Sequence, residues 1–319
     1  MAIQTNYIET SGISYCGKEA QTIFSHDIYE LDLRNVGITY IDGVKARRKI
    51  YMGKWDNAWQ EYTCPFTPDG EVSLSEYFIE PVAIKVNKEF CRNEFWDSYL
   101  VEQTEISLRG GIPQSFSEWY FDKLRKQMAK EYQEMFWQGD TGYTGTTKAF
   151  LKVVNGVEKQ LDDNSGVTKI SGAAFTVDNI LAQVEATIQA GLANAANIEV
   201  PTDNFKVLMN YADVQLLKMA LGKICCPNNE SIFSNYAKGP NGGVIIFGFE
   251  VISTMQSRNT IIFGDPRNLV LGFDTFDSHL QYKIIDMKDT TLDDMYRVGA
   301  ISNIAVGIMF PELFVVSKP

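Results

Sequence analysis

The first 42 residues lack the regular hydrophobic spacing of a long helix or strand. Only a short stretch shows an apolar rhythm, carried by Ile28, Leu31 and Leu33. A segment of this kind rarely builds a core of its own. We therefore predict an N-terminal arm over residues 1–42 that packs on other structure.

Residues 43–90 carry strand signals. β-branched and aromatic residues recur along the segment, and Thr-Pro-Asp-Gly at 67–70 has the composition of a tight turn. The pattern predicts a long two-stranded excursion. Because an isolated ribbon cannot bury large rings by itself, Trp55 and Trp59 are expected to meet another domain or another chain.

The clearest helical pattern spans residues 116–138. Aromatic, leucine and methionine residues recur at steps of three and four positions, and charged residues occupy the remaining positions. Ser115 and Glu118 have the spacing of a capping box, and Gly139 follows where a C-terminal cap belongs. Such a helix would be about 35 Å long, which is typical of a structural spine.

The rest of the chain alternates between loops, helices and strands. The glycine-spaced loop at 139–145 lacks both G-x-G-x-x-G and G-K-[ST], so we interpret it as a turn and not a phosphate site. Residues 155–172 are polar and predict a connecting loop. Residues 175–279 predict an α/β unit, whose first helix is expected to stop near Gly191. Strand patterns return over residues 280–319.

The composition is that of a folded acidic protein. The chain has 319 residues, which suggests about two domains, and 45% of them are hydrophobic. There are 29 Lys and Arg against 40 Asp and Glu, a net charge of −11. This balance argues against a dedicated nucleic-acid binder, because phosphate contacts need clustered basic residues. The best basic cluster, at 45–49, is interpreted as a solvated strand end or a protein contact.

Two further absences narrow the function. No stretch approaches the roughly 20 apolar residues of a membrane span, and no signal-peptide pattern opens the chain. The five cysteines are odd in number and show no C-x-x-C spacing, which indicates thiols in a reducing compartment.

Candidate catalytic residues are few. The chain has only two histidines, His26 and His279, and the usual zinc-ligand spacings do not occur. Asp-Ser-His at 277–279 has the residue types of a triad, but triads are assembled from separated segments. The acidic pairs at 162–163 and 293–294 lack the spacing of a calcium loop. We therefore expect no enzyme activity, no metal and no cofactor.

The order of these parts resembles that of the major capsid proteins of tailed bacteriophages, which have the HK97-like fold. Three local runs are similar to that family as well: Met-Phe-Trp-Gln-Gly-Asp at 135–140, Gly-Asp-Pro-Arg-Asn-Leu-Val-Leu-Gly at 264–272, and Pro-Glu-Leu-Phe-Val-Val at 311–316. The resemblance spans essentially the whole chain. It is one of architecture, so it assigns no catalytic residue.

The resemblance implies an α+β fold of five parts. These are an N-terminal arm at 1–42, an extended β-hairpin loop at 43–90, and a peripheral domain with its spine helix at 91–174. An axial α/β domain would follow at 175–279, and strands at 280–319 would return to complete the peripheral domain.

It also implies a structural subunit of an icosahedral virus shell, made in the host cytoplasm and present in the virion. Copies would form hexamers and pentamers around packaged double-stranded DNA, which they would contact weakly and non-specifically. Other expected partners are a separate scaffolding protein, a portal, and decoration or head–tail proteins. No membrane is expected. The extended loop would lie over a neighbouring subunit. The contact candidates are Trp55, Trp59, Tyr62, Phe66, Arg47 and Arg48.

Two other functions stay open from the sequence. An encapsulin-like nanocompartment shares the fold but encloses protein cargo, and a metabolic α/β enzyme would use residues 175–279. Some members of the resembled family cross-link neighbours through lysine–asparagine isopeptide bonds. Lys54 lies in the excursion and has the side chain that such a bond needs, but the sequence identifies no asparagine and glutamate partner for it.

Overall fold

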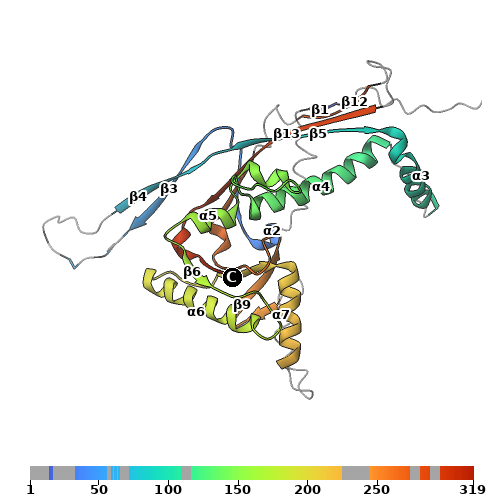
Figure 1. The fold of residues 1–319 in the computed structure, drawn as a ribbon. Helices are drawn as coiled ribbons and strands as arrows, with labels where there is room; N and C mark the ends of the chain where they lie inside the picture. Colours follow the sequence, from blue (N-terminus) through green and yellow to red (C-terminus); the bar gives the residue numbers. More distant parts are fainter. Residues whose placement is uncertain are drawn as a thin grey trace, which may run out of the picture.

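The computed structural model describes residues 14–16, 33–55, 59, 61–62, 64, 72–108, 116–224, 244–273, 281–287 and 295–319. Over these residues the chain forms two six-stranded sheets and a separate two-stranded hairpin. Figure 1 shows the hairpin projecting from one end, and the long helix α4 (Phe116–Gln138) between the two sheets. We call the sheet that contains β13 the peripheral sheet and the sheet that contains β10 the axial sheet.

The peripheral sheet is organised around β13 (Met295–Ile308). Its order is β1-β12-β13-β11-β2, and β5 pairs antiparallel with β13 over residues 295–304. Buried residues alternate with more exposed ones along β13 as far as Ile304, which is typical of a strand with one covered face. The other strands are β1 (Ser14–Cys16), β2 (Thr39–Asp42), β5 (Val82–Cys91), β11 (Leu269–Phe273) and β12 (Gln281–Asp286).

The axial sheet has the order β6-β14-β10-β7-β9-β8 and is covered on both faces. Val207 and Met209 of β7 pack in one cluster with helices α6 (Ile180–Ile198) and α7 (Tyr211–Ile224), whereas Leu208 packs in the cluster that contains α4. Period-two alternation produces this division. The strands are β6 (Thr168–Ser171), β7 (Lys206–Asn210), β8 (Val244–Ile246), β9 (Phe249–Thr254), β10 (Ile261–Gly264) and β14 (Val315–Lys318).

Helix α4 spans Phe116–Gln138, the bounds that its hydrophobic spacing predicted. Phe136 and Trp137, near its C-terminal end, are almost completely buried. They share one cluster with Leu271 and Ile304 of the peripheral sheet and Ile262 of the axial sheet. The two sheets therefore share a core, and α4 lies between them.

Gly139 ends α4 for a reason that its sequence position alone does not reveal. A Cβ on Gly139 would lie less than 3.0 Å from the carbonyl oxygens of Met135 and Val154. A Cβ on Gly156 would lie less than 3.0 Å from the Gly139 nitrogen and from the carbonyl oxygens of Met135 and Phe136. The Gly156 amide donates to the Gly139 carbonyl oxygen at 2.8 Å. The two glycines let the backbone at the end of α4 contact the backbone at the start of α5 (Val157–Asp163).

The predicted connecting loop at 155–172 is wrong. It contains a helix, α5 (Val157–Asp163), and the strand β6. The helix forms because Val157 and Leu161, four positions apart, are both fully buried against the shared core. Two apolar positions among polar neighbours were too few for a visible period.

The predicted end of the first axial helix near Gly191 is also wrong, because α6 continues to Ile198. A Cβ on Gly191 would lie less than 3.0 Å from the ring of Phe263, a fully buried residue of β10. The glycine is required for close approach of helix and sheet, and it does not stop the helix.

Two strands lie in a different sheet from the one that the sequence predicted. The strand pattern at 269–271 belonged to the predicted axial unit, but β11 pairs with β13 and β2. The last strand was expected to complete the peripheral domain, but β14 lies between β6 and β10. The chain changes sheets at Asp265, whose carboxylate accepts the Arg267 amide at 3.0 Å. Both strands are buried on both faces, as interior strands are.

The predicted excursion at 43–90 divides into two parts. Residues 48–55 and 72–79 form the separate hairpin, but β5 belongs to the peripheral sheet, where Val82, Ile84 and Val86 pack toward the shared core. The remaining helices of the described residues are α2 (Leu33–Val36), α3 (Arg92–Leu108), and the short 3-10 segments η1 (Ala149–Val153), η3 (Pro266–Asn268) and η4 (Pro311–Leu313).

Candidate subunit-contact surfaces

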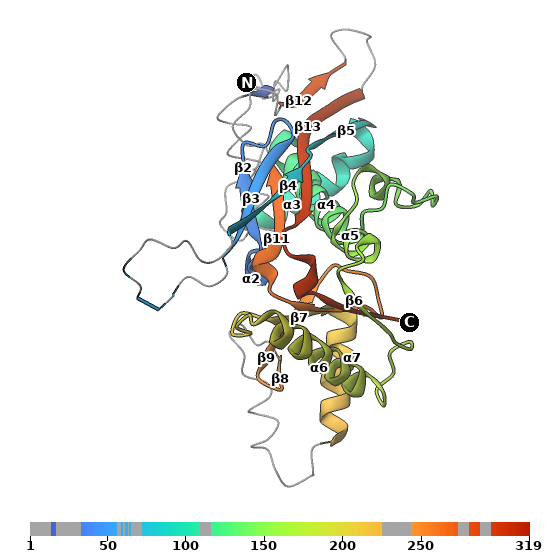
Figure 2. The same ribbon diagram turned by 90° about the vertical axis from the view of Figure 1, so that its left-hand side faces the viewer.

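The hairpin of β3 (Arg48–Trp55) and β4 (Val72–Ile79) projects from the rest of the described fold. The two strands pair antiparallel from Arg48–Ile79 to Trp55–Val72, and no third described strand joins them. Figures 1 and 2 show the ribbon extending away from both sheets. A two-stranded hairpin of this kind is marginal in water by itself, so its far end needs support from elsewhere.

The base of the hairpin is fixed to the peripheral sheet. Ile79 is buried in a cluster with Val270 of β11. The Tyr77 hydroxyl accepts a hydrogen bond from the Ile308 amide at 3.1 Å, and burial raises the pKa of Tyr77. A Cβ on Gly307 would lie 2.9 Å from the Tyr77 ring, so this ring packs directly on the β13 backbone. The hairpin therefore leaves the body from a rigid attachment.

Three of the four predicted contact aromatics lie within the described residues. Trp59 and Tyr62 are 94% and 91% exposed, so almost all of each residue is in contact with solvent. Trp55 ends β3 and pairs by register with Val72. Phe66 lies outside the described residues. The exposed rings of Trp59 and Tyr62 agree with the expectation that this ribbon cannot bury its own aromatics.

The two predicted arginines differ in their surroundings. Arg47 is engaged within its own chain, with Nε 3.0 Å from the Glu80 carboxylate and its guanidinium 4.0 Å from the centre of the Phe78 ring. Arg48 is exposed and pairs by register with Ile79. The cross-link candidate Lys54 pairs by register with Ser73.

Two further contact candidates were missed from the sequence. Tyr51 is 64% exposed and Leu74 is 68% exposed. In the register Tyr51 faces Glu76 and Leu74 faces Gly53, so both lie on one face of the ribbon. The period-two alternation of the strands would have identified them. It places Tyr51 and Leu74 on the other face of the ribbon from Ile50 and Tyr77, which pack against the body.

A second exposed apolar surface lies on α3, a helix that the sequence did not predict. Its inner side packs Tyr99, with Trp96 beside it, into an aromatic cluster with Phe116 and Trp119 of α4. Its outer side exposes Leu100, Val101 and Leu108. Figure 1 shows α3 at the end of the molecule opposite the hairpin. We call Asp97, Leu100, Val101, Thr104 and Leu108 the outer face of α3.

The junction of α3 and α4 is held by Glu102. Its carboxylate accepts the Trp119 indole N–H at 2.7 Å and the Lys123 ammonium at 2.9 Å. These hydrogen bonds, with the Trp119 bond the largest cause, lower the pKa of Glu102. The bonds tie the inner side of α3 to α4, so the outer face of α3 stays directed away from the body.

A buried carboxylate lies where α5 meets the axial sheet. Glu158 is 6% exposed and accepts the Ser257 amide at 2.5 Å, and the Lys318 ammonium is 3.7 Å away. Burial raises the pKa of Glu158 against the effects of both partners. Lys318 also binds Asp162 at 2.5 Å. These contacts join α5 to the axial sheet.

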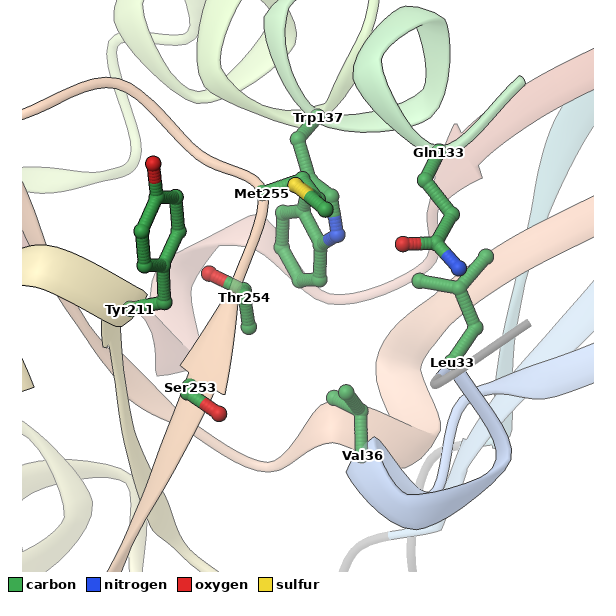
Figure 3. Close-up of a pocket in the computed structure, with 8 residues that line it drawn as sticks. All are labelled: Leu33, Val36, Gln133, Trp137, Tyr211, Ser253, Thr254 and Met255. Carbon is green, nitrogen blue, oxygen red and sulfur yellow. The ribbon is translucent and has the colours of Figure 1, made fainter. Parts of the chain in front are cut away.

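A small hollow of about 70 Å³ lies between α4 and the axial sheet. Figure 3 shows Gln133 and Trp137 reaching into it from α4, with Leu33 and Val36 opposite on α2. Its lining contains no carboxylate, histidine or cysteine, and Tyr211 is its titratable residue. The lining therefore offers no acid–base pair of the kind that general catalysis uses.

Metal and membrane chemistry receive no support from the described residues. Histidine, cysteine, aspartate and glutamate form no group of three or more there that would hold a metal ion. Both histidines fall outside the described residues. None of the helices in the described part of the chain combines the length and the apolar character that a membrane crossing needs.

Comparison with known proteins gives structural likeness without sequence likeness. No family model matches the chain, and no curated protein matches it. A chain of the satellite phage P4 procapsid, which includes the size determination protein, has a TM-score of 0.59 at 12% identity, covering 93% of this chain and 90% of that one. The capsid of a native GTA particle gives 0.56 at 12%, covering 90% and 89%. The capsid of Myoviridae phage XM1 gives 0.56 at 13%, covering 90% and 91%.

These matches extend over nearly the whole chain. At such low identity they speak for the fold alone. The chain therefore has the fold of phage capsid proteins, the HK97-like α+β fold.

Proposed function

We propose that this protein is the structural subunit of an icosahedral virus shell. The observation that carries the proposal is the hairpin, whose exposed Tyr51, Trp59, Tyr62 and Leu74 have no covering element in the described chain. Large exposed apolar surfaces on a folded protein mark sites of association. A shell subunit covers such a surface with its neighbour, and phage capsid chains share this fold.

The finer assembly follows from the same family of folds. We infer hexamers and pentamers that close around packaged double-stranded DNA, with a separate scaffolding protein, a portal, and decoration or head–tail proteins as partners. The protein would be made in the host cytoplasm and end in the virion. The net charge of −11 supports weak, non-specific DNA contact, because strong binding requires clustered basic residues.

We also propose a structural and not a catalytic role. The hollow between α4 and the axial sheet has no acid–base pair in its lining, and the buried Glu158 is engaged by an amide and a lysine. A ligand-dependent shift of the melting temperature, in a screen of metabolites against the purified chain, would contradict this part of the proposal.

Cryo-electron microscopy of the purified protein tests the shell. The chain is expressed alone and together with the genes that flank its own, and particles are imaged over a range of concentrations. Closed shells with hexameric and pentameric units are expected. A small discrete oligomer under every condition would overturn the proposal.

Nuclease treatment of particles from infected cells tests the contents. Protected double-stranded DNA is expected inside the shell. Shells that enclose a specific protein and no DNA would instead identify a nanocompartment of the encapsulin kind.

A further inference from the structure

The turn between β8 and β9 holds a phenylalanine in an unusual backbone conformation. Ile246 pairs with Phe249, so Phe247 and Gly248 form a two-residue turn. Their φ angles are 51° and 88°, and positive φ at both positions is the pattern of a type I′ turn. Glycine enters this left-handed region freely and asparagine tolerates it, whereas a bulky residue there is strained. Phe247 therefore makes the turn less stable than an asparagine would.

The Phe247 ring does not stabilise the core of its own chain. The residue is 51% exposed and belongs to none of the hydrophobic clusters of the described residues. Its neighbours do pack: Ile246 is almost completely buried, and the Phe249 ring lies edge-on to the Phe263 ring with centroids 5.0 Å apart. These residues anchor the turn, and no contact inside the described part of the chain offsets the strain at Phe247.

The turn lies at the edge of the axial sheet. β8 is the end strand of that sheet, and no described strand pairs with its other side. Figure 2 shows β8 and β9 at one side of the axial unit, away from the peripheral sheet. Backbone strain that the surrounding fold does not require is typical of residues that serve an interaction. Aromatic side chains are also prominent among the residues that dominate protein contacts.

The charges near the turn select the class of partner. Over residues 244–254 the one charged side chain is Glu250, which binds the Lys206 ammonium at 3.2 Å. Nucleic acid binds through clustered basic residues, and the turn offers none. An apolar protein surface is therefore the partner that fits Phe247.

We propose that the Phe247 turn is a contact site for a second copy of this chain, in which the Phe247 ring becomes buried. The inference rests on the proposed shell function, because a shell places other copies against the exposed surfaces of each subunit. It goes beyond that function by naming a residue that lowers the stability of the single subunit and serves assembly. The strained turn holds the ring away from the axial core before contact, so little conformational freedom is lost on association.

Three substitutions at this position separate the strain from the ring. Phe247→Asn removes both, Phe247→Ala removes the ring but keeps a Cβ in the left-handed region, and Phe247→Tyr keeps both. In thermal melts of the unassembled chain, Phe247→Asn is expected to raise the melting temperature by about 2–4 °C. The other two should leave it unchanged within about 2 °C.

Shell yield in electron micrographs should follow the ring and not the stability. Under conditions in which the parent forms shells, Phe247→Asn and Phe247→Ala are expected to lower the yield at least about tenfold. Phe247→Tyr should assemble like the parent. A yield of Phe247→Ala equal to the parent's would overturn the contact and leave the shell function standing. A lower melting temperature for Phe247→Asn would overturn the inference too, because the ring would then stabilise its own chain. Absence of any shell from the parent would overturn both.

Photo-cross-linking identifies the partner. A minority of isotopically heavy chains, with benzoylphenylalanine in place of Phe247, is mixed with light parent chains before assembly. After irradiation, mass spectrometry is expected to find products that join a heavy chain to a light one. Products confined to a single chain, or joined only to another protein or to nucleic acid, would overturn the assignment of a second copy.

Discussion

Replacement of Gly191 by alanine separates helix propensity from packing in the axial unit. In an exposed helix, glycine to alanine stabilises by about 1 kcal/mol. At Gly191 the added Cβ would lie less than 3.0 Å from the Phe263 ring, which is fully buried in a close-packed core. Overpacking of this severity costs about 3 kcal/mol. The expected net effect is a loss of about 2 kcal/mol in the free energy of unfolding.

Urea unfolding of the unassembled chain, followed by circular dichroism, measures this loss. In a thermal melt of the same chain, each kcal/mol of lost stability lowers the melting temperature by about 2–4 °C. The melting temperature of Gly191→Ala should therefore fall by about 4–8 °C. Gly222→Ala is the matched control, because Gly222 is an exposed glycine in α7, and it should gain up to about 1 kcal/mol. In a Phe263→Leu background, Gly191→Ala should cost less, since the ring that it meets is gone. A Gly191→Ala chain as stable as the parent would refute the reasoning.

Three further substitutions test an exposed ring, a partly buried hydroxyl and a buried carboxylate. Trp59→Ala should leave the unfolding midpoint unchanged within about 0.5 kcal/mol, because the side chain is 94% exposed, and yet lower the shell yield in electron micrographs; unchanged yield would contradict its contact role. Tyr77→Phe removes the acceptor of the Ile308 amide and should cost about 1 kcal/mol in urea unfolding, whereas a neutral result would show that water replaces the hydroxyl. Burial raises the pKa of Glu158 in the folded chain above its value in the unfolded chain. Protonation of Glu158 therefore stabilises the fold below the unfolded-state pKa, and this stability is lost as the pH rises through the folded-state pKa. Glu158→Gln should flatten this decline in urea midpoints taken from about pH 4 to about pH 8, and an equally steep decline would exclude Glu158 as its source.

Local patterns predicted the elements that are long and one-sided. The bounds of α4 could be predicted because its apolar stripe continues over six turns. The hairpin could be predicted because strands and turn signals follow one another directly. Helix α3 escaped prediction because both of its sides carry apolar residues: Tyr99 faces the core, while Val101 and Leu108 face outward. Its stripe is therefore not one-sided, and the 3.6-residue period disappears.

Sheet membership could not be predicted, because it depends on contacts distant in sequence. Strand β14 is a run of consecutive buried residues that any sheet interior would accept, and only its pairing with β10 and β6 decides its place. Gly191 was misinterpreted for a similar reason: the ring that explains it belongs to Phe263, on another element. Of the surface candidates, Trp59 and Tyr62 stood out by type, whereas Tyr51 and Leu74 required the strand register.

The position of β14 has a consequence for synthesis of the protein. This strand, near the end of the sequence, occupies an interior place between β6 and β10, and β13 likewise occupies the centre of the peripheral sheet. Neither sheet can close until residues 295–318 have left the ribosome. Until then, a nascent chain has an incomplete body behind its hairpin. Contacts between copies that depend on either complete sheet can therefore form only after both strands have been added.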